Sequence, residues 1–199
     1  MARGMVGNIV LREPVVTRRA LVIGGMAVLV FCRVRLARAQ DISSYYDIAM
    51  AAARNKANDV IVMLQAGKIP NVTDDSGETP IGYAAQFGNI RMLQALIYYK
   101  AKVDARDRLG NTPLHWAALR GNTAAIELLL GAKAMVDPQN RQGVTPLMMA
   151  ASHSQVPAVR LLLKNGADPH KEDFTGRDAI GWADGKLNVL QFLRAAKPG

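Results

Sequence analysis

The stretch that decides the fold is TPLHWAALRGN, residues 112–122. Its elements recur along the chain at a spacing of 33 residues, together with a glycine that precedes each Thr-Pro pair. The glycines are Gly77, Gly110, Gly143 and Gly176, the Thr-Pro pairs are Thr79-Pro80, Thr112-Pro113 and Thr145-Pro146, and the Ala-Ala pairs are Ala51-Ala52, Ala84-Ala85, Ala117-Ala118 and Ala150-Ala151. Self-similarity at one period predicts a stack of equivalent units, and each unit buries its apolar face only against its neighbours.

Each position of the repeated stretch suits the start of a helix. Glycine permits the positive φ of a tight turn without steric cost. The threonine two residues later is a favourable helix cap, and proline suits the first helical position because an N–H group has no intrahelical partner there. The Ala-Ala pair keeps this first helix thin, so we expect adjacent units to approach closely.

A second helix is predicted after each first helix. Gly88-Asn89 and Gly121-Asn122 mark the turns between the two helices. The apolar residues at helical spacing are Ile90, Leu93, Leu96 and Ile97, then Ile126, Leu129 and Leu130, then Val159, Leu162 and Leu163. This spacing indicates a helix with one apolar face.

The run at residues 112–118, followed by Gly121-Asn122 and Leu128-Leu129-Leu130, resembles the ankyrin repeat. The resemblance covers residues 41–197, and several motif copies in register make it specific. It implies an all-α ankyrin-repeat solenoid of about five helix-turn-helix repeats with short hairpin turns. The expected repeats span about residues 41–74, 75–107, 108–140, 141–173 and 174–197. The end repeats are atypical: Tyr46-Asp47 replaces Thr-Pro in the first, and Asp178 is predicted to cap a helix in the last.

Residues 1–39 indicate a cleavable signal peptide. Arg18 and Arg19 precede an uncharged stretch at residues 20–32, and the small-x-small site Ala37-Arg38-Ala39 follows. A membrane span takes roughly 20 apolar residues, and the uncharged stretch holds 13, so cleavage after Ala39 is favoured over a retained anchor. We therefore predict an ankyrin repeat domain at residues 40–199.

The residues around Arg18 and Arg19 are similar to the bacterial twin-arginine export signal. An ordinary secretory signal that happens to contain two adjacent arginines is the alternative. Lipid attachment at Cys32 is disfavoured because the bulky Phe31 precedes it. Both export routes predict a periplasmic or secreted bacterial protein.

The formal net charge of +9 belongs mostly to the leader. Residues 1–39 hold seven Lys/Arg and one Glu, so residues 40–199 hold 18 basic and 15 acidic residues, a net charge of +3. A nucleic-acid surface needs basic residues clustered on one face, whereas Asp104 and Asp107 interrupt the basic run at residues 100–108. The one cysteine lies in the leader, so we expect no internal disulfide in the mature chain.

No combination of side chains predicts a catalytic, cofactor or metal site. His115, His153 and His170 fall at different repeat positions and lack metal-ligand spacing. The resemblance gives His115 a structural role in hydrogen bonding between turns. Residues Asp74, Asp107, Asn140 and Asp173 share one repeat position. Recurrence there indicates turn geometry rather than catalysis.

Large side chains also share one repeat position. They are Tyr83, Trp116, Met149 and Trp182. We interpret this column as packing between repeats, with some edges reaching the concave face.

The resemblance implies a partner-binding surface at the hairpin tips and the exposed ends of the first helices. We expect apolar residues such as Leu109, Val144 and Phe174 at this surface, mixed with arginines. Such a mixture is typical of an interface centre, although scattered exposed apolar residues are normal on any protein. The predicted set is Asp75, Glu78, Gln86, Phe87, Arg108, Leu109, Asn111, Leu119, Arg120, Arg141, Gln142, Val144, Ser152, His153 and Phe174.

The sequence thus predicts a non-enzymatic protein-protein interaction module that acts in the periplasm through the concave face of the stack. A stabilising or regulatory accessory subunit of an exported enzyme, with one constant partner, is the alternative. We expect a protein partner, no cofactor, no nucleic acid, no stable membrane insertion after signal cleavage, and a monomer in isolation.

Overall fold

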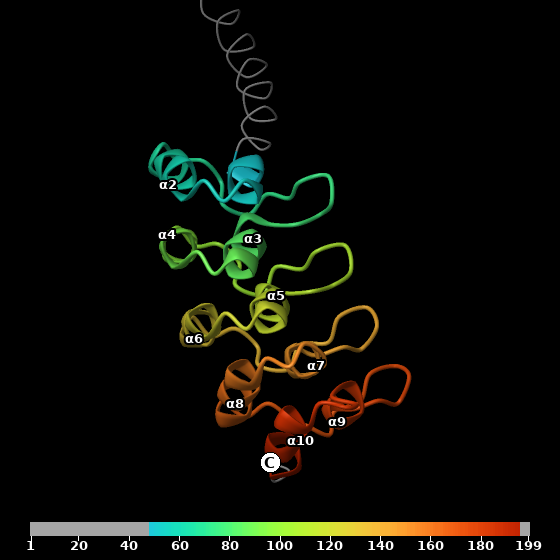
Figure 1. Cartoon of the computed structure of the whole chain (residues 1–199). Coiled ribbons are helices and arrows are strands. Elements are labelled where there is room, and N and C mark those ends of the chain that lie inside the picture. The colour runs from blue at the N-terminus through green and yellow to red at the C-terminus, as the bar shows by residue number, and fades with distance from the viewer. Residues whose placement is uncertain (1–47, 196–199) are drawn as a thin grey trace, which may run out of the picture. The chain divides into compact units, whose positions relative to one another are not determined.

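The computed structural model describes residues 48–195, and this part of the chain is helical without a strand (Figure 1). The predicted signal peptide, Cys32 and the Tyr46-Asp47 turn lie outside the described residues, so these predictions stay untested. Residues 48–53 are helical. The helices that follow are α2 (Ala57–Gln65), α3 (Pro80–Phe87), α4 (Ile90–Tyr98), α5 (Pro113–Arg120), α6 (Thr123–Gly131), α7 (Pro146–Ser152), α8 (Val156–Lys164), α9 (Ala179–Trp182) and α10 (Leu187–Ala195).

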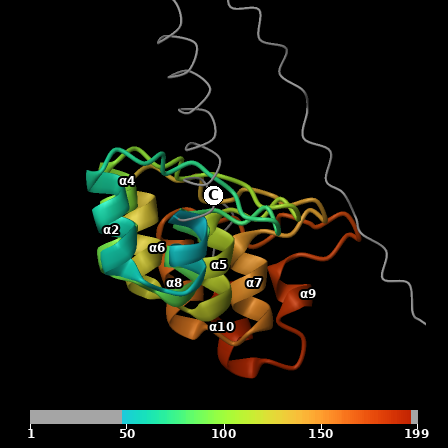
Figure 2. The ribbon, with the colours of Figure 1, turned by 90° about the horizontal axis from the view of Figure 1, so that it is seen from above.

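These helices form two layers (Figure 2). In the first-helix layer α3 packs against α5, α5 against α7, and α7 against α9. In the second-helix layer α2, α4, α6, α8 and α10 pack in the same succession. The hairpin turns extend from the first-helix layer, on the side away from the second (Figure 1). The expected all-α repeat architecture is confirmed for the described residues, and the number of repeats stays a prediction.

The first helices begin as the repeated stretch predicts. The Thr79 hydroxyl accepts from the Gly82 N–H at 3.2 Å, and the Thr145 hydroxyl accepts from the Met148 N–H at 3.3 Å. Asp178 caps the last first helix by accepting from the Gly181 N–H at 2.8 Å. Helices α3, α5 and α7 each start at proline. The predicted caps at Thr79, Thr145 and Asp178 are therefore confirmed.

The turns between paired helices also join neighbouring repeats. Gly88 and Gly121 end their helices with φ of 63° and 70°, in the left-handed region that glycine tolerates. The Asn122 side chain donates to the Ala85 and Gln86 carbonyls at 2.9 and 3.0 Å, so it satisfies the end of α3 from the next repeat. Each helix end is thus fixed partly by the following unit.

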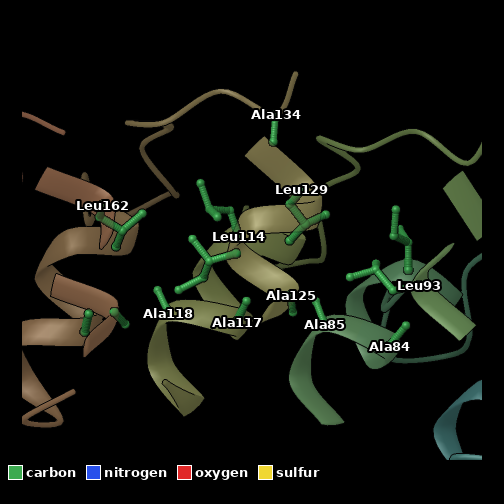
Figure 3. Packing of buried hydrophobic residues seen from close by; sticks show 14 of the residues in the cluster. Ala84, Ala85, Leu93, Leu114, Ala117, Ala118, Ala125, Leu129, Ala134 and Leu162 are labelled. Atoms are coloured by element: carbon green, nitrogen blue, oxygen red, sulfur yellow. The ribbon is translucent and has the colours of Figure 1, made fainter. Parts of the chain in front are cut away.

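The core lies between the two layers (Figure 3). Ala84, Ala85, Ala117 and Ala118 are 0% exposed in the first-helix layer, where the small side chains allow close approach. Leucines of the second-helix layer fill the space opposite them, and Leu129 is also 0% exposed. Truncation of such a leucine to alanine costs about 2–5 kcal/mol of unfolding free energy. Stability is therefore shared along the stack.

Within residues 48–195, no helix combines the length and apolar character needed to cross a membrane.

Candidate partner-binding surface

The hairpin turns are built around one side chain each. The Asp107 Oδ1 atom accepts from the Leu109 and Asn111 N–H groups, both at 2.8 Å. Asn140 makes the equivalent bonds to Gln142 and Val144 at 2.9 and 3.0 Å. Because an amide oxygen and a carboxylate oxygen make the same bonds, the role of this position is turn geometry, as predicted.

Three junctions separate successive hairpin turns. We define the first junction by residues 74–78 and 107–111, the second by 107–111 and 140–144, and the third by 140–144 and 173–177. The Arg141 N–H donates to the Leu109 carbonyl at 3.0 Å across the second junction. The Phe174 N–H donates to the Gln142 carbonyl at 3.1 Å across the third. No backbone hydrogen bond joins the two turns of the first junction, although both are fully described.

Side-chain hydrogen bonds also connect the turns of the second and third junctions. Arg106 donates to the Gly110 and Gln139 carbonyls at 2.9 and 2.7 Å. Gln139, one repeat later, donates to the Gly143 and Glu172 carbonyls at 3.0 and 2.9 Å. The first junction has Thr73 at this position, and the structure gives its short side chain no such bond.

His115 ties the start of α5 to the second junction. Its Nδ1 atom accepts from the Thr112 N–H at 3.0 Å, so the proton is on Nε2, which donates to the Val144 carbonyl at 3.0 Å. Burial lowers the pKa of His115 to about 4, which keeps the ring neutral. The predicted structural role of His115 between turns is confirmed.

Glu78 takes the place of that histidine in the preceding repeat. Gly82 stands where α5 has His115, and a side chain at residue 82 would collide with the Glu78 carboxyl. Glu78 folds into this space, and its Oε1 atom accepts from the Thr79 N–H at 3.0 Å. The residue is consequently only 9% exposed.

The buried Glu78 carboxyl is costly to ionise. Desolvation raises its pKa to about 7, and the negative charges of Asp107 and Asp74 add to the increase. The Trp116 indole N–H faces this carboxyl and has the smallest of the named effects, a lowering of the pKa. The indole nitrogen is buried without reaching hydrogen-bond geometry to any acceptor of the described chain.

The repeat position of Trp116 is held elsewhere by Tyr83, Met149 and Trp182, and the polar groups of Tyr83 and Trp182 are hydrogen-bonded. The Tyr83 hydroxyl donates to the Asp74 Oδ2 atom, and the Trp182 indole N–H donates to the Asp173 Oδ2 atom at 2.8 Å. Tyr83, Met149 and Trp182 also pack against the core, as the column predicts. Trp116 differs from them, since its nitrogen lacks an acceptor.

A surface pocket of about 280 Å³ lies at the first junction. Its walls are Ser76, Glu78, Tyr83, Gln86, Asp107, Arg108, Leu109 and Trp116. The predicted residues Glu78, Gln86, Arg108 and Leu109 therefore come together here, with Trp116 as an unforeseen neighbour. Among residues 48–195 no group of three His, Cys, Asp or Glu side chains is arranged to hold a metal ion.

A sequence model described as ankyrin repeats (3 copies) matches residues 49–140, 91–173 and 120–198, which together cover more than half of the chain. The chain belongs to the ankyrin repeat family. A search of curated proteins found no significant match.

The predicted ankyrin surface is only partly accessible. The exposed members are Asp75, Phe87, Arg108, Leu109, Arg120, Arg141, Gln142, His153 and Phe174, the half-buried ones are Gln86, Leu119 and Ser152, and the buried ones are Glu78, Asn111 and Val144. Large apolar residues are exposed at the tips, with Leu109 at 62% and Phe174 at 72%. Exposed apolar residues also occur in the second-helix layer, where Val62 is 62% exposed, so exposure alone does not mark the surface.

The expected exposure of Val144 is wrong. Val144 is 2% exposed because its N–H donates to Asn140 and its carbonyl accepts from His115, which draws the residue into the second junction. Asn111 is 3% exposed because its amide donates to Asp107 and accepts from Asn140. These side chains hold the ankyrin turns together and are not available to a partner.

Sequence reasoning missed the distinct character of the first junction. Trp116 was assigned to packing between repeats, with some edges of its column reaching the concave face, and Glu78 was expected on the surface. A comparison of equivalent repeat positions could have predicted the buried Glu78. His115 and Met148 hold the position at which this repeat has Gly82, so the glycine leaves a space there that another side chain must fill.

Proposed function

We propose that this ankyrin repeat protein is a non-enzymatic protein-protein interaction module whose partner docks on the hairpin tips and the first-helix layer. Ankyrin repeats are generally modules of this kind. The observation that carries the proposal is the pocket at the first junction, bordered by the exposed Leu109 and Arg108. Arginine, tyrosine and tryptophan are enriched among the residues that dominate binding energy, and the pocket has Arg108, Tyr83 and Trp116 in its walls.

His115, which precedes the pocket residue Trp116 in the chain, supports a binding role over a catalytic one. Both ring nitrogens of His115 are engaged in hydrogen bonds, and its low pKa keeps the ring neutral at physiological pH. General acid-base catalysis requires a group with a pKa near the working pH and access to substrate. Glu78 has such a pKa, but its Oε1 atom is bonded to the backbone, and the Ser76 and Tyr83 hydroxyls of the pocket wall donate to Asp74 instead of Glu78.

A photo-crosslinking amino acid at position 109, introduced into the full chain in the native cell, tests the proposed surface. We expect it to capture protein partners that the same amino acid at Val62 does not capture. The two positions are a matched pair, because both residues are 62% exposed, Leu109 in a hairpin turn and Val62 in helix α2 of the second-helix layer. Equal capture from both positions would contradict the assignment of the surface. One constant partner would favour an accessory subunit, and several partners would favour a scaffold.

The place of action is part of the proposal. The basic leader with Arg18 and Arg19, the short uncharged stretch and the Ala37-Arg38-Ala39 site support export to the bacterial periplasm. The double substitution Arg18→Lys/Arg19→Lys should block export by the twin-arginine route and leave the full-length precursor inside the cell. Unchanged processing and export of this variant would contradict that route.

A further inference from the structure

Two exposed arginines are placed in the same way on successive hairpin turns. A Cβ atom at Gly77 would collide with the Arg108 side chain, and one at Gly110 would come within 3.2 Å of the Arg141 side chain. Each arginine stem therefore lies over a glycine of the preceding turn. Because the stems are already held in place, less conformational freedom is lost when a partner binds the guanidinium groups.

Neither arginine is neutralised within the described chain. No ion pair there involves Arg108 or Arg141. Residues 106–111 and 139–144 contain three arginines and one carboxylate. That carboxylate, Asp107, already accepts three hydrogen bonds within its own turn, and its counterpart in the next turn is the uncharged Asn140. These two turns thus carry a surplus of positive charge.

The turn at residues 173–177 is different, because its arginine has partners. The Arg177 guanidinium lies 3.5 Å from the Asp173 Oδ2 atom and 4.6 Å from the centre of the Trp182 ring. This turn therefore neutralises its arginine internally, whereas the two preceding turns leave theirs to the surroundings.

An exposed leucine lies between the two arginines in the row of turns. Leu109 follows Arg108 in the chain, and its carbonyl accepts from the Arg141 N–H at 3.0 Å. We call these three residues the arginine strip. The same repeat position holds Asp75 in the turn before and Phe174 in the turn after, so the strip is two turns long.

We propose that an acidic segment of the protein partner docks along the arginine strip, with carboxylates at Arg108 and Arg141 and an apolar side chain at Leu109. A guanidinium binds a carboxylate through paired, charge-assisted hydrogen bonds. Complementary charge also speeds association and disfavours wrong partners. This inference rests on the proposed function, since it names the chemistry that the docking surface recognises.

The surroundings of the strip favour a peptide segment over a nucleic acid. A nucleic-acid backbone carries a negative charge at every nucleotide. Such a chain, continuing past the strip, would meet Asp75 in the turn on one side and the exposed Glu172 in the turn on the other. A short acidic segment ends before both carboxylates.

The first test uses the photo-crosslinking amino acid at position 109 of the full chain in the native cell. The captured peptide, identified by mass spectrometry, should carry Asp or Glu on both sides of the crosslinked residue. The double substitution Arg108→Gln/Arg141→Gln should reduce capture by about tenfold or more, since hydrogen bonds between charged groups are the stronger class.

The chain offers a matched control for this variant. Lys100 and Lys133 are also exposed and 33 residues apart, but they follow α4 and α6 of the second-helix layer. Lys100→Gln/Lys133→Gln removes the same charge and should leave capture unchanged. The arginine side chains that form hydrogen bonds in the described chain are Arg106 and Arg177, so the substitutions at 108 and 141 should leave the thermal stability unchanged.

The second test measures recognition without the native partner. The full chain labelled with ¹⁵N is titrated with Ac-Glu-Glu-Leu-Glu-Glu-NH₂, Ac-Gln-Gln-Leu-Gln-Gln-NH₂ or oligothymidine at low salt. We expect the acidic peptide to shift the backbone N–H signals of Leu109 and Gln142 saturably. The glutamine peptide and the signal of Lys133 should show no change, and the arginine variant should bind the acidic peptide about tenfold more weakly or worse.

An equal response to the glutamine peptide, no response to the acidic peptide, or equal losses in the arginine and lysine variants would overturn the inference. A response to oligothymidine that matches the acidic peptide would overturn it in favour of a nucleic acid. Capture at position 109 that persists in Arg108→Gln/Arg141→Gln would remove this inference and leave the proposed function intact. Failure of capture in the wild-type chain would count against the proposed function, and the titration would still decide which charge the strip binds.

Discussion

The first and second junctions share one backbone design and differ in how they are filled. In the second, Asn111 bonds to Asp107 and Asn140, and the Arg141 N–H reaches the Leu109 carbonyl. In the first, Glu78 faces Asp107 across a pocket of about 280 Å³, and no backbone bond crosses it. The helices of both repeats are packed with the same alanine columns. A backbone hydrogen bond between turns is therefore not needed for stacking, and one junction can keep a surface pocket available for binding.

The unfolding free energy should be most sensitive to loss of the central side chain of the second junction, Asn140. Asn140→Ala removes the acceptor for the Gln142 and Val144 N–H groups and the donor to Asn111. Leaving such buried groups unsatisfied should reduce the unfolding free energy by about 3 kcal/mol. Urea denaturation measures the loss, and Asn140→Asp is the control, because it keeps the turn and should lose less. A loss below about 0.5 kcal/mol for Asn140→Ala would show that the closed junction adds little.

The contribution of the first junction to the unfolding free energy should fall as the pH rises. The pKa of Glu78 is raised from 4.5 to about 7 in the folded chain, so the folded state holds the proton more tightly than the unfolded state. The resulting contribution of Glu78 to the unfolding free energy is fully present below about pH 4.5 and is lost as the pH rises through about 7. Linkage gives a change on the order of 2–3 kcal/mol. Because His115 opposes this decline below about pH 6.5, the measurement is the difference in unfolding free energy between the wild-type chain and Glu78→Gln, which should change by this amount from pH 5 to 8. Parallel curves of the two chains would contradict the prediction.

The second junction should respond to pH in the opposite direction. The pKa of His115 is lowered from 6.5 to about 4, so the unfolded state holds its proton more tightly. This contribution is present above about pH 6.5 and is lost as the pH falls towards 4. The two effects oppose each other between pH 4.5 and 6.5, so we expect a nearly flat wild-type curve there. Glu78→Gln should reveal a rise of about 2 kcal/mol with pH, and the addition of His115→Met should remove that rise.

The backbone bond across the second junction should give the smallest effect. Arg141→Pro removes the N–H group that donates to Leu109, whereas Arg108→Pro removes an N–H that makes no bond across the first junction. Both residues follow the first residue of a turn, where proline is well tolerated. We expect Arg141→Pro to be less stable than Arg108→Pro by about 1 kcal/mol. Equal thermal stabilities of the two variants would indicate that this bond does not contribute.

The fold was predictable because each local signal has one structural meaning. Glycine, threonine and proline at fixed offsets specify a turn and a helix start, and Thr79, Thr145 and Asp178 make the predicted caps. The alanine pairs specify close packing and are buried as expected. Such signals depend on a few neighbouring residues, so one sequence is enough to read them.

The candidate site was predictable only in outline. The hairpin tips contain Leu109 and Arg108 on the surface as expected, but Val144 and Asn111 are buried by bonds to His115 and Asn140. These partners lie 29 residues away in the chain, so local patterns do not specify the contacts. The inward turn of Glu78 follows from the missing side chain at Gly82, and comparison of equivalent positions between repeats would have shown it.

The pKa of the Glu78 carboxyl in the full chain, measured by ¹³C NMR, tests the central claim most directly. Glu78→Gln identifies the signal, and Asp107→Asn should lower the measured pKa because it removes a nearby negative charge. A buried, uncompensated carboxyl in an open junction predicts titration at about 7. Titration near the ordinary value of 4.5, unchanged by Asp107→Asn, would show that Glu78 is solvated or already paired and would contradict the account.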